Sequence, residues 1–298
     1  RSDGGVRPRI IAGTSYFYIM RKLLPLFKHR FGPLLVLAFI LCSLSLLTRI
    51  ILLIWSWPNL DHNPLYLLGA FLIGFFYDLV VCGFFAIPVA LYCWLMKDSW
   101  YQKKWQRIPL FVLFFLVTLI LVVNVCAEIV FWDEFNVRYN FIAVDYLIYT
   151  TEVLGNIWES YNIPLIIGAV VLVVVLLLFL VRKKLVESQQ SSMRFKKRTV
   201  FFLCFLLFPL AGYFLVNNRF KDISSNNYIN ELGGNGIYEF GSAFWNNEID
   251  YNKFYITRND TANFAILRTM LQAPNATFSG DPLSIERNIR SDSPEHRW

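Results

Sequence analysis

The chain has 298 residues, of which 56% are hydrophobic and only 16% charged, and its mean hydropathy is +0.46. Long uncharged apolar runs of this kind exclude an ordinary soluble domain and predict an integral membrane protein. The net charge of +7 does not indicate nucleic-acid binding, because the basic residues cluster beside the apolar runs, as expected for contact with an anionic membrane leaflet. We therefore expect membrane phospholipids, and no nucleic acid, as partners.

The first residues differ in character from the rest of the chain. Residues 1–19 are rich in Gly and Arg and precede Met20, which is followed by the basic sequence RKLLPLFKHR. We expect residues 1–19 to be a disordered or appended N-terminus. A signal peptide is not indicated, since the apolar run after Met20 is far longer than the roughly 7–15 residues of such a segment.

Apolar runs predict five membrane spans, at about 33–55, 66–96, 108–131, 163–181 and 199–216. The second run, Tyr66–Met96, decides the topology, because it could cross once or twice. Its 31 residues contain no Lys or Arg and would form a helix of about 46 Å. Two spans would each need at least about 17 residues plus a turn, so one tilted span, or one bent at Pro88, fits better.

The distribution of Lys and Arg supports the single crossing. Basic residues gather before the first span, between the second and third, and between the fourth and fifth, namely Arg21, Lys22, Lys28 and Arg30; Lys97, Lys103, Lys104 and Arg107; and Arg182, Lys183, Lys184, Arg194, Lys196, Lys197 and Arg198. With five crossings all three clusters lie on one side, which the positive-inside rule makes the cytoplasm. The N-terminus is then inside, and everything after Asn217 is outside.

Two segments are expected on the outer side. The loop after the third span interleaves aromatic and polar residues, which predicts one or two short helices in the interface plane. This loop is either a simple connector or a platform for a lipid headgroup or an outer domain. The tail, 218–298, has turn signals at NELGGNG and SGDP, a helical pattern in NDTANFAILRTMLQ, and few apolar runs from which to build its own core.

The predicted fold class is therefore an all-α integral membrane protein. It comprises a five-helix transmembrane bundle (20–217), an interfacial helical loop, and an outward helical or irregular C-terminal connector (218–298) that packs against something larger.

Ionisable residues inside a membrane are costly and are candidates for function. Four polar residues within the spans form a candidate intramembrane or lipid-headgroup site: Arg49, Asp78, Asn124 and Glu128. Arg49 and Asp78 are predicted to form a structural ion pair between the first two spans, with a lipid-headgroup pocket as the alternative. Asn124 and Glu128 are four residues apart and so share one helix face. Ion coupling is less favoured, because no internal repeat is present.

Signatures of soluble enzymes are absent from the sequence. It contains no P-loop, no G-x-S-x-G and no HExxH, and its three histidines are scattered. The five cysteines all lie in apolar runs without metal-binding spacing and are expected to be packing residues. We therefore predict no catalytic residue, cofactor site or metal site in this chain.

Three stretches carry a resemblance to a known family: GAFLIGFFYDL (69–79), FWDEFNVRYNFIAVDYLIYTTEVLGNIWESY (131–161) and NNYINELGGNGIYEFGSAFWNNEIDYNKFY (226–255). Together they resemble the membrane half of lipoteichoic-acid-synthase-like enzymes of the sulfatase/alkaline phosphatase superfamily. These include phosphoglycerol and phosphoethanolamine transferases of the bacterial cytoplasmic membrane. The resemblance implies an external α/β domain in which a metal-bound Thr, with a divalent ion such as manganese or zinc, takes the headgroup from a phospholipid.

The family's nucleophile and metal ligands have no positions in this sequence. The resemblance thus implies a membrane-anchoring and connector region, inactive alone, with the missing catalytic domain packing on the outer loop and the connector. Two other hypotheses stay open. One is a non-catalytic membrane module that binds lipid or a partner protein, and the other is a small transporter that uses Arg49, Asp78 and Glu128.

Overall fold

A computed structural model of the chain describes residues 26–246 and 258–290. Residues 1–19, for which disorder or an appended origin is expected, lie outside the described residues. So do residues 247–255, the last part of the third stretch that resembles the family. The chain divides into two compact units, residues 1–247 and 248–298, and each is described by itself.

The first unit is built on five long helices, which match the five predicted spans: α2 (Gly32–Trp55), α3 (Pro64–Phe85), α6 (Arg107–Phe135), α9 (Ile163–Ser188) and α10 (Phe195–Leu215). Two of them begin just after an asparagine that caps the helix. Asn63 accepts a hydrogen bond from the amide of Leu65, and Asn162 from that of Leu165, so each side chain satisfies an otherwise unpaired amide. All five helices are long and apolar enough to cross a membrane. The bundle is therefore that of a membrane-embedded helical protein.

The second predicted span is interrupted near Pro88, as expected. α3 ends at Phe85 and α4 (Ile87–Leu95) follows at once. Proline has no N–H, so Pro88 cannot complete the helical hydrogen bond to the carbonyl of residue 84. Ala86 nevertheless keeps helical dihedrals (φ −80°, ψ −12°), and its amide donates to the carbonyl of Cys82 at 2.9 Å. The helix therefore bends here and does not reverse.

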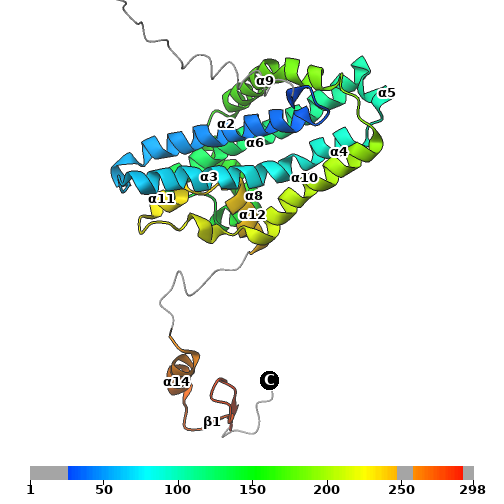
Figure 1. Cartoon of the computed structure of the whole chain (residues 1–298). Helices are drawn as coiled ribbons and strands as arrows, with labels where there is room; N and C mark the ends of the chain where they lie inside the picture. The colour runs from blue at the N-terminus through cyan, green and yellow to red at the C-terminus, as the bar shows by residue number, and fades with distance from the viewer. Residues whose placement is uncertain (1–25, 247–257, 291–298) are drawn as a thin grey trace, which may run out of the picture. The chain divides into compact units, whose positions relative to one another are not determined.

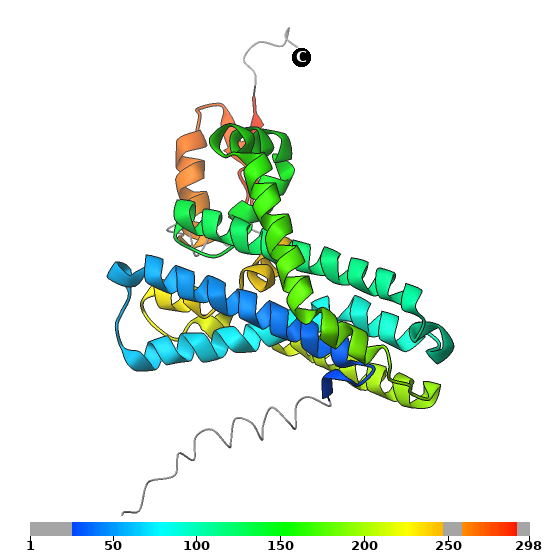
Figure 2. The same ribbon diagram turned by 90° about the horizontal axis from the view of Figure 1, so that it is seen from above.

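The core of the bundle lies between α2, α4, α6 and α9. Leu37, Val89, Leu110, Phe114 and Val174 are completely buried there. α2 and α3 run side by side, and α10 packs along α3 and α4 (Figures 1 and 2). Only 17–39% of the apolar stretch of each long helix is buried. The remaining leucine, valine and phenylalanine side chains face outward, as an apolar solvent requires.

Three basic segments meet at one end of the bundle, which we call the basic end. Arg30, just before α2, donates to the carbonyl of Cys93 at 2.6 Å and pairs with Asp98. Arg198 at the start of α10 donates to the carbonyl of Met96. Two short elements connect α4 to α6 there, α5 (Asp98–Tyr101) and η2 (Lys104–Gln106). The segments with the densest positive charge are thereby brought together.

The opposite end carries the connections η1 (Trp57–Asn59), α7 (Phe141–Ile148) and α8 (Thr150–Ser160). The two short helices predicted after the third span are confirmed; their place in a membrane interface stays a prediction. α6 continues to Phe135, beyond the predicted end at residue 131. It stops at Asn136, whose left-handed φ of 54° ends the helix in the manner typical of asparagine.

Residues 218–246, here called the docking segment, turn back onto the bundle after α10. They form η3 (Asn218–Lys221), α11 (Asn227–Leu232) and α12 (Gly236–Trp245). α11 contacts α2 and α3, and α12 contacts α3, α6 and α7 (Figure 1). Ile229 and Leu232 are completely buried among side chains that include Leu52 and Trp132. The first compact unit thus extends beyond the span boundary drawn at residue 217.

The second unit contains α14 (Asp260–Leu271) and a hairpin of β1 (Ala276–Phe278) and β2 (Arg287–Ile289), with Ala276 opposite Ile289. The predicted helix and the turn at SGDP are confirmed. The strands are not part of the all-α prediction. Arg268 of α14 donates to the carbonyls of Ser279 and Ser284, in the loop that joins the two strands. None of the residues described in this unit, 258–290, is buried, in keeping with the few apolar runs of this segment.

Candidate functional site

Arg49 on α2 and Asp78 on α3 form the predicted ion pair. Nη1 and Nη2 of the arginine lie 3.0 and 3.1 Å from the two carboxylate oxygens, a bidentate arrangement, and both side chains are 1% exposed. Gly74, one helical turn before Asp78, makes room for the guanidinium. A Cβ at that position would lie only 2.3 Å from the guanidinium carbon.

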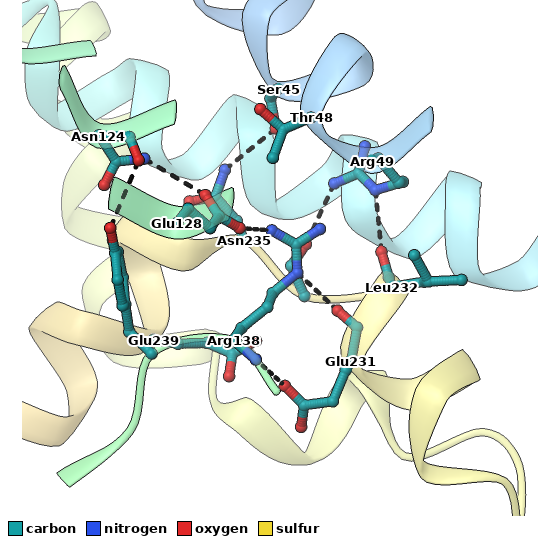
Figure 3. Close-up of polar contacts among 12 residues, drawn as sticks. Ser45, Thr48, Arg49, Asn124, Glu128, Arg138, Glu231, Leu232, Asn235 and Glu239 are labelled. Atoms are coloured by element: carbon teal, nitrogen blue, oxygen red, sulfur yellow. Dashed lines mark hydrogen bonds and ion pairs between the residues drawn. The ribbon is translucent and has the colours of Figure 1, made fainter. Parts of the chain in front are cut away.

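The docking segment and Ser45 of α2 supply the remaining partners of this pair. Arg49 Nε donates to the carbonyl of Leu232 at 2.9 Å and Nη2 to that of Gly234 at 3.1 Å (Figure 3). Asn235 Nδ2 donates to Asp78 at 2.8 Å, and the hydroxyl of Ser45 also donates to this carboxylate. Each nitrogen of the guanidinium and each oxygen of the carboxylate therefore has a protein partner.

A small cleft of about 160 Å³ opens between α2 and α3 beside this pair. It is lined by Cys42, Ser43, Leu46, Arg49, Phe71, Phe75 and Asp78. Most of the lining is apolar, and the hydrogen-bonding atoms of the ion pair are engaged by Ser45 and the docking segment. A lipid headgroup in the cleft would have to compete with those partners. The geometry therefore favours the structural interpretation of the pair.

Asn124 and Glu128 share a face of α6 as predicted, and Asn124 Nδ2 donates to Glu128 at 3.3 Å. The strongest partner of Glu128 is Arg138, on the link between α6 and α7. Arg138 also reaches the docking segment, because its Nε donates to the carbonyl of Glu231 at 2.6 Å and its amide to the Glu231 carboxylate at 2.9 Å (Figure 3). Gly236 lies against Glu128, and a Cβ there would be 2.5 Å from the carboxylate.

Lys221 and Glu239 complete this second network. Lys221 Nζ lies 2.8 Å from the Glu231 carboxylate and 2.6 Å from that of Glu239. Burial raises the pKa of Glu239 to about 7, although the adjacent Lys221 acts to lower it. Burial alone would lower the pKa of Lys221, but the two carboxylates outweigh it and raise that pKa above its ordinary value.

The structure thus divides the four predicted site residues between two neighbouring networks. Arg49 and Asp78 belong to one, and Asn124 and Glu128 to the other; the docking segment contacts both. Six further members of these networks are not among the residues predicted from the sequence: Ser45, Arg138, Lys221, Glu231, Asn235 and Glu239. The signal that could reveal some of them is the run NELGGNG (230–236), which by its turn residues alone predicts only a turn. Its acidic, amide and glycine residues suit a backbone that must approach charged side chains closely.

Comparison with known proteins adds no relative, because no family model, characterised protein or solved structure matches this chain. Within residues 26–246 and 258–290, no three His, Cys, Asp or Glu side chains are grouped so that they could hold a metal ion. What these networks can do chemically is fasten one segment to another and bind protons.

Proposed function

We propose that this chain is the membrane-anchoring and connector region of a phosphoglycerol or phosphoethanolamine transferase related to lipoteichoic-acid synthases. One observation carries the proposal: the three stretches that resemble this family in sequence meet in space. The first contributes Asp78, the second Glu128's partner Arg138, and the third Glu231 and Asn235, and these residues contact one another directly or through the docking segment.

In this proposal the docking segment fixes the position of the chain beyond it. Hydrogen bonds from Arg49 and Arg138 to residues 231–234, and from Asn235 to Asp78, hold the docking segment on the bundle, so the chain leaves the membrane at a defined place beside α7. A transferase that takes its headgroup from a phospholipid must hold its reactive group at the height of the membrane surface. A fastened connector supports this requirement better than a flexible tether.

The described residues do not fit the divalent metal of this family. The acidic side chains of the second network face Arg138 and Lys221, which occupy the positions that a cation would need. We therefore derive no catalytic step for this chain. Purified chain in phosphatidylglycerol or phosphatidylethanolamine vesicles with manganese is expected to release no diacylglycerol, and release would contradict the anchoring role.

The proposed topology places the N-terminus in the bacterial cytoplasm and the docking segment at the outer surface. It is supported by the gathering of basic segments at one end of the bundle. In a variant without native cysteines, Asn263→Cys on the exposed face of α14 should react with an impermeant thiol reagent in intact spheroplasts. Lys103→Cys should react only after lysis. The reverse pattern would overturn the orientation.

A fusion tests the anchoring function. The whole chain is joined to the catalytic domain of a phosphoethanolamine transferase that lacks its own membrane region, and diacylglycerol release is measured in vesicles. We expect higher turnover than with a fusion to an unrelated five-helix anchor of the same orientation. Equal turnover from the two fusions would reject a specific positioning role and favour a module that binds lipid or another protein.

A further inference from the structure

The docking segment closes over more negative than positive charge. In the described part of the chain, the second network holds three carboxylates and two cations, Arg138 and Lys221. Glu128 and Glu239 are buried, and the Glu231 side chain is 17% exposed. The Arg49–Asp78 pair beside them is neutral and cannot compensate. An uncompensated buried charge is costly, and a buried acid avoids that cost by binding a proton.

Glu239 is the carboxylate with the poorest compensation. Glu128 is paired with Arg138. Glu231 is paired with Lys221 and also accepts a hydrogen bond from the amide of Arg138. Glu239 shares Lys221 through Oε2 only, while its Oε1 is buried without a hydrogen-bond partner among the described residues.

The backbone closes tightly around that oxygen. At Gly234 a Cβ would lie 1.8 Å from Glu239 Oε1. The glycine therefore seals this side of the carboxyl group and leaves no space for a compensating side chain. The carboxyl group can be neutralised by a proton far more easily than by a second cation.

The groups that face Glu239 come from every element packed around it. They are Lys221 of η3, Glu231 of α11, Arg138 before α7, Tyr77 of α3 and Tyr238 of α12. The tyrosines carry no charge near pH 7, and lysine and arginine stay protonated. Asp222 and Glu128 lie one residue further away, beside Tyr77 and Arg138.

We propose that Glu239 is a proton-binding site, and that docking of residues 218–246 on the helix bundle takes up one proton near neutral pH. Acidification then strengthens docking and alkalinisation weakens it. In the undocked segment Glu239 is in water, with the ordinary pKa of 4.5, whereas in the docked state burial raises that pKa to about 7. The docked state therefore holds the proton more tightly, and docking is favoured less as pH rises from below 4.5 to above 7. This inference holds whether or not the chain anchors a transferase.

Hydrogen–deuterium exchange of the full chain in lipid nanodiscs tests the proposal. Protection of the amides of residues 227–240, corrected for the intrinsic pH dependence of exchange, reports the docking equilibrium. For the pKa change given above we expect about a tenfold loss of protection between pH 6 and pH 8. Glu239→Gln should remove this pH dependence and keep protection high at pH 8. Glu134→Gln, the same change at an exposed carboxylate of α6, should behave like the unaltered chain.

Two further measurements keep the test decisive if Glu239→Gln fails to fold. Glu231→Gln removes the excess negative charge, so the midpoint of the protection curve should shift to lower pH. Infrared difference spectra of the unaltered chain between pH 6 and pH 8 should show loss of a protonated carboxyl band. Protection that is independent of pH, an unshifted midpoint in Glu231→Gln, or the same pH dependence in Glu239→Gln would each overturn the proposal.

Discussion

The two charge networks beneath the docking segment are built on opposite principles. Arg49 and Asp78 balance each other, and each nitrogen of the guanidinium and each oxygen of the carboxylate has a protein partner. The network around Glu239 carries one carboxylate too many, and it leaves Glu239 Oε1 and Arg138 Nη2 buried without hydrogen-bond partners in the described structure. Asp78 and Glu239 are both buried, so compensation by neighbouring groups is what distinguishes these two carboxylates.

This difference assigns separate roles to the two networks, although residues 230–236 of the docking segment contact both of them. A fully compensated pair contributes the same fastening at every pH where both groups are charged. An undercompensated carboxylate makes the fastening depend on proton concentration. The Arg49–Asp78 network thus fixes the position of the docking segment. The network around Glu239 makes the strength of its docking depend on pH.

The largest expected effect comes from removing half of the compensated pair. Arg49→Leu or Asp78→Leu should each lower the unfolding free energy by about 3–5 kcal/mol, because the partner is left as an uncompensated buried charge. The double variant should lose clearly less than the sum of the two single losses. Unfolding in mixed micelles with increasing sodium dodecyl sulfate measures all three variants. Additive losses would show that the two residues do not stabilise each other.

A smaller effect is expected where the backbone seals Glu239. Gly234→Ala places a methyl group 1.8 Å from the carboxylate oxygen, so the loop or the side chain must move, at a cost of about 1–3 kcal/mol. Gly241→Ala is the matched control, because nothing lies within 4 Å of its Cβ and alanine is favoured inside α12. Protection of residues 227–240 from hydrogen exchange should fall in the first variant and not in the second. Equal protection in both would show that the tight approach at Gly234 has no energetic weight.

Much of the bundle could be predicted from the sequence, because length, hydropathy and charge are local properties. The five long helices, the interruption near Pro88 and the Arg49–Asp78 pair all follow from the spacing of residues along single helices and from the antiparallel course of two neighbours. The hydrogen bond from Asn124 to Glu128 could likewise be predicted, because residues four apart lie on the same face of a helix.

The docking segment could not be predicted in the same way. Its place depends on partners 157 to 190 residues away, such as Asp78 and Ser45 for Asn235, and nothing in a local pattern encodes such distances. Its polar composition indicates exposure to water, yet Glu239 is buried, with Lys221 of the same segment as its cationic partner.

The smallest effect is expected at the basic end, where an ion pair reaches the surface. Arg30 is completely buried, but Asp98 is 34% exposed, and Arg30 keeps the carbonyls of Cys93 and Met96 as acceptors if the carboxylate is lost. Water also screens the Asp98 charge, so Asp98→Asn should cost only about 1 kcal/mol or less. Asp78→Asn, the same change in a side chain that is 1% exposed, should cost several times more. Added salt should reduce the effect at Asp98 and leave that at Asp78 unchanged, since screening acts on exposed charges. Equal losses, or equal sensitivity to salt, in the same unfolding assay would show that burial does not set the strength of these pairs.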